Sequence, residues 1–206
     1  MLILEHGCCV FPCPTKKKNP LLGDAVMGFP ADYTVVDLET TGLNPATDLI
    51  IEFAALKVRN GEIIDKFQSL CDPGFPIPPQ IEAITGISSE MVRNSPNPRS
   101  VLPDFLDFVE DDFVVGHNVL FDVRFIAACN GDFKNTYIDT MRLFRKLHPN
   151  LMHHRLSDMV HFYNATNETA HRALSDCFAT QSCFEAMSCE VDKIFGTKEA
   201  FLKALK

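Results

Sequence analysis

The chain has 206 residues, a hydrophobic fraction of 46% and a net charge of -8 at pH 7, which are values typical of one folded domain rather than a disordered or fibrous chain. No tract approaches the ~18 consecutive apolar residues of a membrane-spanning helix, so no membrane partner is expected. The acidic charge argues against a protein that holds duplex nucleic acid through a broad basic surface.

Residues 1–30 are predicted to be an N-terminal extension that need not be rigid, and residues 31–206 to be the folded domain. Four prolines interrupt the extension, and it has no sustained helical or strand period. Its start lacks the basic flank and small-residue cleavage site of a signal peptide. Five cysteines lie in apolar segments, where we expect reduced core residues: Cys71, Cys129, Cys177, Cys183 and Cys189. A cytoplasmic protein is therefore expected.

The first regular elements are predicted to be three strands, at residues 33–38, 49–59 and 62–71. Asn60 and Gly61 separate the last two. Both residue types tolerate positive φ, so this pair predicts a two-residue hairpin turn. The domain is therefore expected to open with an antiparallel meander.

Two helices are expected after the proline-rich segment "DPGFPIPPQ". Ser88, followed by Met91 and Val92, indicates a short capped helix. The segment "PRSVLPDFLDFVED" has apolar residues at helical spacing, and we expect its helix to have Pro103 near its start.

The second half of the sequence alternates short strands with helices. The strands are expected in "FVVGH" and "YIDT". The helices are expected at residues 119–129, 141–147, 156–163, 173–187 and 198–205. This alternation predicts an α/β fold whose sheet is covered by helices on both faces.

Two acids interrupt the first apolar strand, in the stretch "YTVVDLETTG". Side chains alternate along a strand, so Asp37 and Glu39 project from one face, and Val36 and Leu38 from the other. Two close carboxylates need a metal ion or a basic partner, and no Lys or Arg is near in sequence. Taken alone, the pair could equally be two acids at a solvated strand end.

Two further segments carry candidate residues. Asp122 begins a helix directly after a buried strand, where α/β proteins gather functional groups; a helix N-terminus also favours an acid without any function. His171 and Asp176 are five residues apart, or ~140° on one helix, so they would not share a face. If His171 instead lies in a loop before a helix that begins near Ala173, it can lie over a site into which Asp176 points.

The segments "DLETTGL", "GHNVLFD" and "HRALSD" resemble, in this order, the three motifs of the DEDDh superfamily of 3′-5′ exonucleases. The resemblance spans residues 33–187. It is strongest to the proofreading exonuclease domain of the replicative DNA polymerase of Gram-positive bacteria and to the epsilon subunit of other bacteria. It implies a ribonuclease H-like mixed sheet, in which parallel strands follow the meander.

The resemblance also implies the roles of five residues. Asp37, Glu39, Asp122 and Asp176 would bind two Mg²⁺ or Mn²⁺ ions, with His171 as the general base. Asp37 would bridge both ions, Glu39 and Asp176 would bind the ion on the nucleophile side, and Asp122 would act on the other. Hard oxygen ligands suit these metals, and an imidazole can accept a proton from water at neutral pH.

In relatives, the residues after the first motif and the "TGI" turn surround the terminal nucleotide. The residues expected to bind substrate here are Thr40, Thr41, Ile84, Thr85, Gly86 and Asn118. Several others are expected to be structural: His117 beside the substrate or in the fold, His153 and His154 at the surface or at a cap, Asp139 in local structure, and Phe121 and Phe125 in the core.

The leading hypothesis is a two-metal 3′-5′ exonuclease that releases nucleoside 5′-monophosphates from a single-stranded or frayed DNA 3′ end during proofreading or repair. A replication polymerase would be its candidate partner. Two alternatives stay open. One is a 3′-5′ exoribonuclease acting on RNA, and the other is a non-catalytic docking module.

Overall fold

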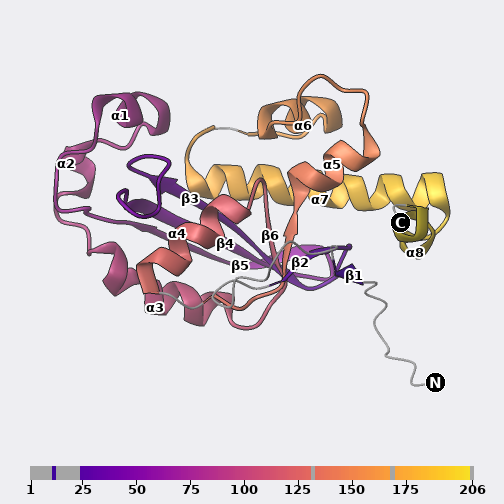
Figure 1. Cartoon of the computed structure of the whole chain (residues 1–206), viewed down its shortest axis with the longest axis horizontal. Helices are drawn as coiled ribbons and strands as arrows, with labels where there is room; N and C mark the ends of the chain where they lie inside the picture. Colours follow the sequence, from indigo (N-terminus) through magenta and orange to yellow (C-terminus); the bar gives the residue numbers. More distant parts are fainter. Residues whose placement is uncertain (1–10, 13–23, 131–132, 168–169, 205–206) are drawn as a thin grey trace.

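The computed structural model describes residues 11–12, 24–130, 133–167 and 170–204. Helices lie on both sides of a seven-stranded sheet with the strand order β1-β2-β7-β6-β3-β4-β5 (Figure 1). The predicted α/β architecture is therefore confirmed. No helix in the described part of the chain is both long and apolar enough to cross a lipid bilayer.

The antiparallel meander is formed by β3 (Tyr33–Thr40), β4 (Ile50–Arg59) and β5 (Glu62–Leu70). Asn60 and Gly61 connect β4 to β5 with φ values of 52° and 80°, as the hairpin prediction requires. β3 extends past the predicted end at residue 38, because its pairing with β4 continues to Thr40. Asp37 and Glu39 therefore lie within the paired part of the strand, close to its carboxyl end.

Two short parallel strands follow the meander. β6 (Val114–Gly116) pairs with β3, and β7 (Tyr137–Asp139) pairs with β6. The carboxyl ends of these parallel strands share one edge of the sheet, which is where α/β folds place functional groups.

The sheet continues into the N-terminal extension, where the sequence indicated no strand. β2 (Ala25–Met27) pairs in parallel with β7, and β1 (Phe11–Pro12) pairs antiparallel with β2. Strands this short carry too few residues for a detectable period. Residues 1–10 and 13–23 lie outside the described residues, and the domain boundary at residue 31 stays a prediction.

A hydrophobic core lies on each face of the sheet. Val35 packs into the core beneath the C-terminal helices, whereas its neighbour Val36 packs into the core on the opposite face. Full burial of a side chain of this size contributes about 1.5–3 kcal/mol. The helices that cover the two faces are α3 (Pro98–Val109) and α4 (Leu120–Asn130) on the Val36 face, and α5 (Thr140–Leu147), α6 (Leu156–Tyr163), α7 (Ala173–Phe195) and α8 (Lys198–Ala204) on the Val35 face.

Three details of the helices differ from the predictions. A helix that was not predicted, α1 (Pro79–Thr85), precedes α2 (Ser89–Val92). α3 begins at Pro98, so Pro103 lies inside the helix instead of near its start. α7 continues beyond residue 187 to Phe195, because apolar residues keep packing on the core until the left-handed Gly196 ends it.

Ser88 caps α2 as predicted, since its side chain accepts a hydrogen bond from the amide of Met91. The cysteine prediction is correct for most of the five residues, which are all free thiols. Cys189 is the exception because its side chain is exposed on α7.

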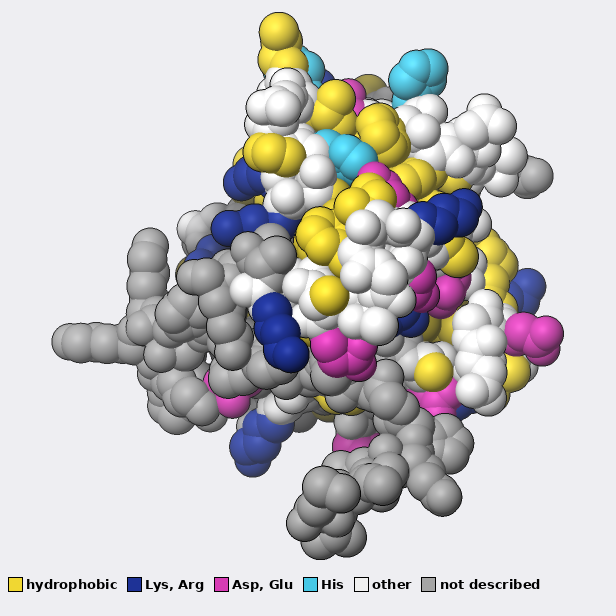
Figure 2. Space-filling view, turned by 90° about the vertical axis from the view of Figure 1, so that its right-hand side faces the viewer, with side chains coloured by type: hydrophobic (Ala, Val, Ile, Leu, Met, Phe, Trp, Pro, Cys, Tyr) yellow, Lys and Arg dark blue, Asp and Glu magenta, His cyan; other side chains and the backbone are white. Residues whose placement is uncertain are grey.

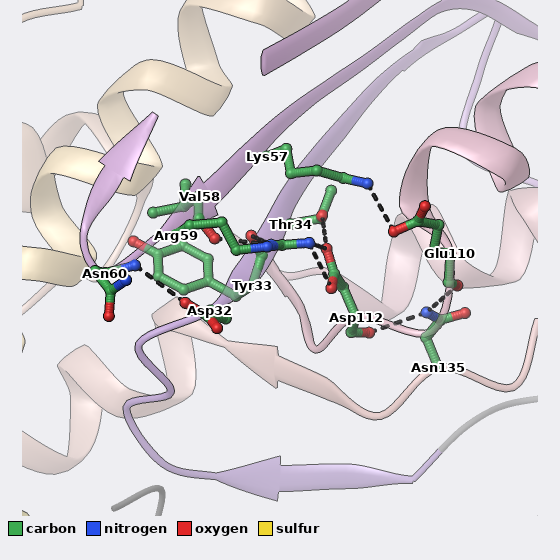
Figure 3. Close-up of polar contacts among 10 residues, drawn as sticks. All are labelled: Asp32, Tyr33, Thr34, Lys57, Val58, Arg59, Asn60, Glu110, Asp112 and Asn135. Atoms are coloured by element: carbon green, nitrogen blue, oxygen red, sulfur yellow. Dashed lines mark hydrogen bonds and ion pairs between the residues drawn. The ribbon is translucent and has the colours of Figure 1, made fainter. Parts of the chain in front are cut away.

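A polar network ties the sheet together at the end away from the carboxyl edge (Figure 3). Asp112, in the turn between α3 and β6, accepts two hydrogen bonds of 2.9 Å from the Arg59 guanidinium and one of 2.6 Å from the Thr34 hydroxyl. Lys57 forms an ion pair of 2.9 Å with Glu110, and the Asn135 amide donates to the carbonyls of Glu110 and Asp112. Asp112 and Glu110 therefore each have a basic partner within the chain.

The face in Figure 2 mixes charges of both signs. Lys and Arg side chains are interspersed there with Asp and Glu side chains and with apolar ones, so this face has no continuous basic band among its described residues.

Candidate metal and catalytic centre

Three acids from two distant segments meet at the carboxyl end of β3. Asp37, Glu39 and Asp176 each offer a carboxylate oxygen, and these oxygens lie within 4.8 Å of one another. Strand alternation places Asp37 and Glu39 on the face that α7 covers, since Asp37 lies opposite Ala54 of the core beneath that helix. Asp176 lies in the first turn of α7 and reaches the same point.

Asp122 is placed beside these acids by a gap in the sheet. β6 ends at Gly116, whereas β3 continues, so the Leu38 amide has no partner strand on that side. Asp122, in the first turn of α4, fills the gap, and its Oδ1 accepts a hydrogen bond of 3.1 Å from the Leu38 amide. Asp122 is not one of the three acids whose oxygens converge within 4.8 Å, although its charge raises the pKa of Asp37.

The electrostatics of the cluster disfavour negative charge. Burial, followed by the charges of Asp122, Asp176 and Glu39, raises the pKa of Asp37 well above its usual range. Burial, followed by the charge of Asp176, raises the pKa of Glu39 to about 8. Burial also raises the pKa values of Asp122 and Asp176. Like charges in a low-dielectric site repel, and a bound cation would reverse these shifts.

The donor set fits a hard divalent cation. All three converging groups are carboxylates, the ligands that Mg²⁺ and Mn²⁺ prefer. None of the ion pairs formed between described residues involves Asp37, Glu39 or Asp176. The residues present can therefore hold a metal ion, and no side-chain cation of the described chain takes its place.

His171 lies in the loop before α7, as the sequence required for a residue that shares a site with Asp176. Its φ of 63° turns the chain sharply, and its amide donates a hydrogen bond of 3.2 Å to Oδ2 of Asp176. His171 is an exposed residue. The backbone of His171 thus contacts the acid cluster through Asp176.

Three residues near the site were missed in the sequence. The Asn167 amide donates a hydrogen bond of 2.6 Å to Oδ1 of Asp176. Glu52, which is fully buried on β4 opposite Glu39, pairs with Arg172. Glu52 had a signal of the same kind as Asp37, a carboxylate within a continuous apolar run. Asn167 had none, because its contact depends on a loop conformation.

The residues predicted to bind substrate lie in two groups. Thr40 and Thr41 hold the loop after β3, where the Thr40 hydroxyl donates to the Gly42 carbonyl and the Thr41 hydroxyl accepts from the Leu49 amide. At the end of α1, the Thr85 hydroxyl accepts from the Ile87 amide, Gly86 is left-handed, and Ile84 is 55% exposed. Their contact with substrate stays a prediction.

Asn118 and Asp139 belong to one local structure. Asn118 is left-handed with a φ of 60°, and its amide donates to Oδ1 of Asp139. Asp139 also accepts from the amides of Met141 and Arg142 and so caps α5, which confirms its predicted structural role. The exposed Asn118 side chain remains a predicted substrate ligand.

The other histidines and the aromatic pair behave as structural residues. The His117 ring contacts the Thr140 hydroxyl, and burial lowers its pKa to about 4. The His154 ring contacts the His148 carbonyl at the end of α5, and His153 is exposed. Phe121 and Phe125 pack with ring centroids 4.8 Å apart against the core on the α4 face, as expected.

Residues 34–184 match the model of the exonuclease family RNase_T. Among curated proteins, the chain is 39% identical over 173 residues to a DNA polymerase III PolC-type of Lacticaseibacillus paracasei, covering 81% of this chain and 12% of that protein. It is 41% identical over 155 residues to the PolC-type polymerase of Listeria innocua, covering 73% of this chain and 11% of that protein. The chain thus spans a small part of these relatives.

Two solved structures show the same fold. Exonuclease X in complex with 5′-overhanging duplex DNA is 26% identical with a TM-score of 0.63, and the match covers 82% of this chain and 96% of that one. Escherichia coli exonuclease I in complex with a dT13 oligonucleotide is 21% identical with a TM-score of 0.67, covering 81% of this chain and 43% of that one. The ribonuclease H-like fold expected from the sequence is confirmed.

Proposed function

Because the chain belongs to the RNase_T exonuclease family, we propose that it is a metal-dependent 3′-5′ exonuclease that releases nucleoside 5′-monophosphates from single-stranded or frayed DNA ends. One observation carries this proposal: the oxygens of Asp37, Glu39 and Asp176 lie within 4.8 Å of one another, beside the exposed His171. The match to the family model supports the assignment of exonuclease chemistry to this acid cluster.

The four acids would hold two Mg²⁺ or Mn²⁺ ions. Asp37, Glu39 and Asp176 supply the converging oxygens, and Asp122 stands on the α4 side of Asp37. When bound, a pair of such ions stabilises the charge that develops on the phosphoryl and leaving oxygens of an in-line displacement. The chain itself contributes four carboxylates from β3, α4 and α7, and the oxygens of three of them already converge.

His171 is the proposed general base. Its exposed imidazole can accept the proton of an attacking water, since histidine titrates near neutral pH. The left-handed turn at His171 and the hydrogen bond from its amide to Asp176 fix the backbone of His171 beside this acid, which supports the assignment. A base of this kind typically contributes ~10²–10⁴ in rate.

The terminal nucleotide is proposed to bind between the loop after β3 and the end of α1. Ile84 is 55% exposed, so its apolar side chain is accessible and can pack against a base. Gly86 leaves open space, because a Cβ built there would meet no atom within 4 Å. Thr40, Thr41, Thr85 and Asn118 complete the proposed pocket.

The decisive test uses two matched substitutions, one at each end of the sheet. Asp37→Asn and Asp112→Asn make the same chemical change, at the acid cluster and at the paired network respectively. Release of 5′-monophosphates from a 3′-labelled single strand in Mn²⁺ should fall by roughly 10³-fold for Asp37→Asn and stay near the wild-type rate for Asp112→Asn. Equal activity in both variants would sink the assignment.

The substrate is DNA in this proposal, because the relatives are named as DNA polymerases and both solved structures hold DNA. Matched DNA and RNA oligonucleotides test it directly. Faster release from RNA would favour the exoribonuclease alternative. A replication polymerase is the proposed partner, to be sought by pull-down with the full chain.

A further inference from the structure

Glu52 is a carboxylate that the proposed mechanism does not use. It is fully buried on β4 and lies directly opposite Glu39 in the strand register. A buried charge costs several kcal/mol unless its lone pairs are satisfied. Such a residue beside a reaction centre therefore needs an explanation of its own.

The partners of Glu52 lie in the short segment that joins His171 to Asp176. The Arg172 guanidinium donates from Nη2 to Oε1 at 2.9 Å and from Nε to Oε2 at 3.3 Å, and the Ala173 amide donates to Oε2 at 3.0 Å. Gln68 of β5 completes the set with a bond of 2.8 Å to Oε1.

Each of these bonds fixes a different part of the segment. The Ala173 amide is the first of α7 and would otherwise lack a partner, so Glu52 caps the helix from the neighbouring strand. The Arg172 carbonyl accepts the Asp176 amide at 3.0 Å, which places the metal-binding acid one turn along. His171 precedes the anchored residue directly, and its backbone is turned back to Asp176.

We propose that Glu52 and Arg172 form a clamp that positions His171 and Asp176 for catalysis. This inference rests on the roles proposed above for those two residues. Arg172 suits the task because its planar fork fixes both distance and direction, whereas a lysine would act as a point charge. Besides burial, the charge of Glu52 raises the pKa of Glu39, and the charge of Arg172 acts against that rise.

A role in holding α7 on the sheet does not explain this arrangement. The helix already buries a long series of apolar residues against the β3 and β4 side of the sheet, among them Cys177, Phe184 and Met187. The clamp acts only at the first residue of the helix, next to the acid cluster. The clamp therefore fixes the N-terminal end of α7, which carries Asp176.

The test compares two arginines that each form an ion pair with a carboxylate. Arg172→Lys keeps the charge beside Glu52 but loses the fork, and Arg59→Lys makes the same change in the pair with Asp112. Their side chains are similarly exposed, at 27% and 26%. Arg172→Lys should lower kcat and weaken Mn²⁺ binding, measured by calorimetry, by roughly 10–100-fold each, with KM little changed. Arg59→Lys should leave both at wild-type values.

A double variant, Glu52→Gln with Arg172→Gln, removes both charges together and leaves no buried charge unpaired, so it gives a second test if the lysine variant folds poorly. It should show the same losses. Wild-type kcat and Mn²⁺ affinity in Arg172→Lys, or equal losses in Arg59→Lys, would overturn the clamp. If the wild-type chain shows no release that Asp37→Asn abolishes, the proposed function fails instead, and the Mn²⁺ affinities still decide the clamp.

Discussion

The two ends of the central sheet both gather acids, but they neutralise them differently. At the end shown in Figure 3, Asp112 is held by Arg59, and Glu110 by Lys57. At the other end, Asp37 and Glu39 form no ion pair with any described residue. The same strands, β3 and β4, run through both ends.

The difference separates stability from function on one scaffold. Paired acids lower the free energy of the folded state without any ligand, because their charges and lone pairs are satisfied within the chain. Buried acids without such partners raise it, and they persist because a cation can bind them. A carboxylate is therefore informative about function only when its compensation is known.

The largest effect on kcat is expected from His171, the general base proposed at the acid-cluster end of the sheet. His171→Gln should lower kcat by about 10²–10⁴ while the Mn²⁺ dissociation constant stays within about twofold, because none of the ion pairs between described residues joins the imidazole to the acids that would hold the metal. His153→Gln, at an exposed histidine, is the matched control. A parallel loss of Mn²⁺ affinity would assign His171 to metal binding.

The stabilisation of the folded chain by Mn²⁺ at the acid cluster should depend on pH. The pKa of Glu39 is raised from 4.5 to about 8, so the folded chain holds more protons than the unfolded one in that window. The metal-free protein should therefore lose stability as pH rises from about 4.5 to about 8. Mn²⁺ at 100 times its dissociation constant should add about 2.7 kcal/mol, and more at pH 8 than at pH 6 for a fixed concentration. Thermal unfolding with and without Mn²⁺ measures this, and a pH-independent gain would contradict it.

Asp112→Asn should destabilise the polar network at the other end of the sheet, where Asp112 pairs with Arg59. The substitution removes the charge that faces Arg59, and we expect the free energy of unfolding to fall by about 1–3 kcal/mol. Urea denaturation at pH 7 without metal gives the value. Asp37→Asn, measured in the same way, should instead stabilise the metal-free protein, because it removes one of several repelling buried charges. Destabilisation by both substitutions would end the distinction between the two regions.

The smallest effect on stability is expected from the ion pair between Lys57 and Glu110. Glu110 is 57% exposed, so water already screens its ion pair with Lys57. Lys57→Met should lower the free energy of unfolding by less than about 1 kcal/mol, and 0.5 M salt should reduce the difference further. A larger loss would show that packing of the lysine over Phe108, 5.2 Å from the ring centroid, carries the stability.

Local rules predicted much of the site. Alternation along β3 is enough to place Asp37 and Glu39 on one face. The spacing of His171 and Asp176 is enough to exclude a shared face of one helix, so the two residues could share a site if His171 lay in a loop before α7. The order of strands and helices likewise indicated the layers of the fold. The first two inferences need only the geometry of one strand or helix, and the third needs only the order of the elements along the chain.

Contacts between distant segments were beyond such rules. Glu52 and Arg172 are 120 residues apart, and their pairing follows from the way α7 crosses β4. Asn167 reaches Asp176 only through the path of its loop. β2 is a strand because β7 offers it an edge, not because Ala25–Met27 has a pattern. Tertiary packing decided all three.

The hydrogen bond from Leu38 to Asp122 gives the molecule an internal reporter. An amide proton that faces a carboxylate resonates at a different field when that carboxylate is ionised, so the Leu38 signal in a nitrogen-correlated magnetic resonance spectrum follows the protonation of Asp122. One backbone signal can thus register when the centre fills, without an attached probe and without turnover.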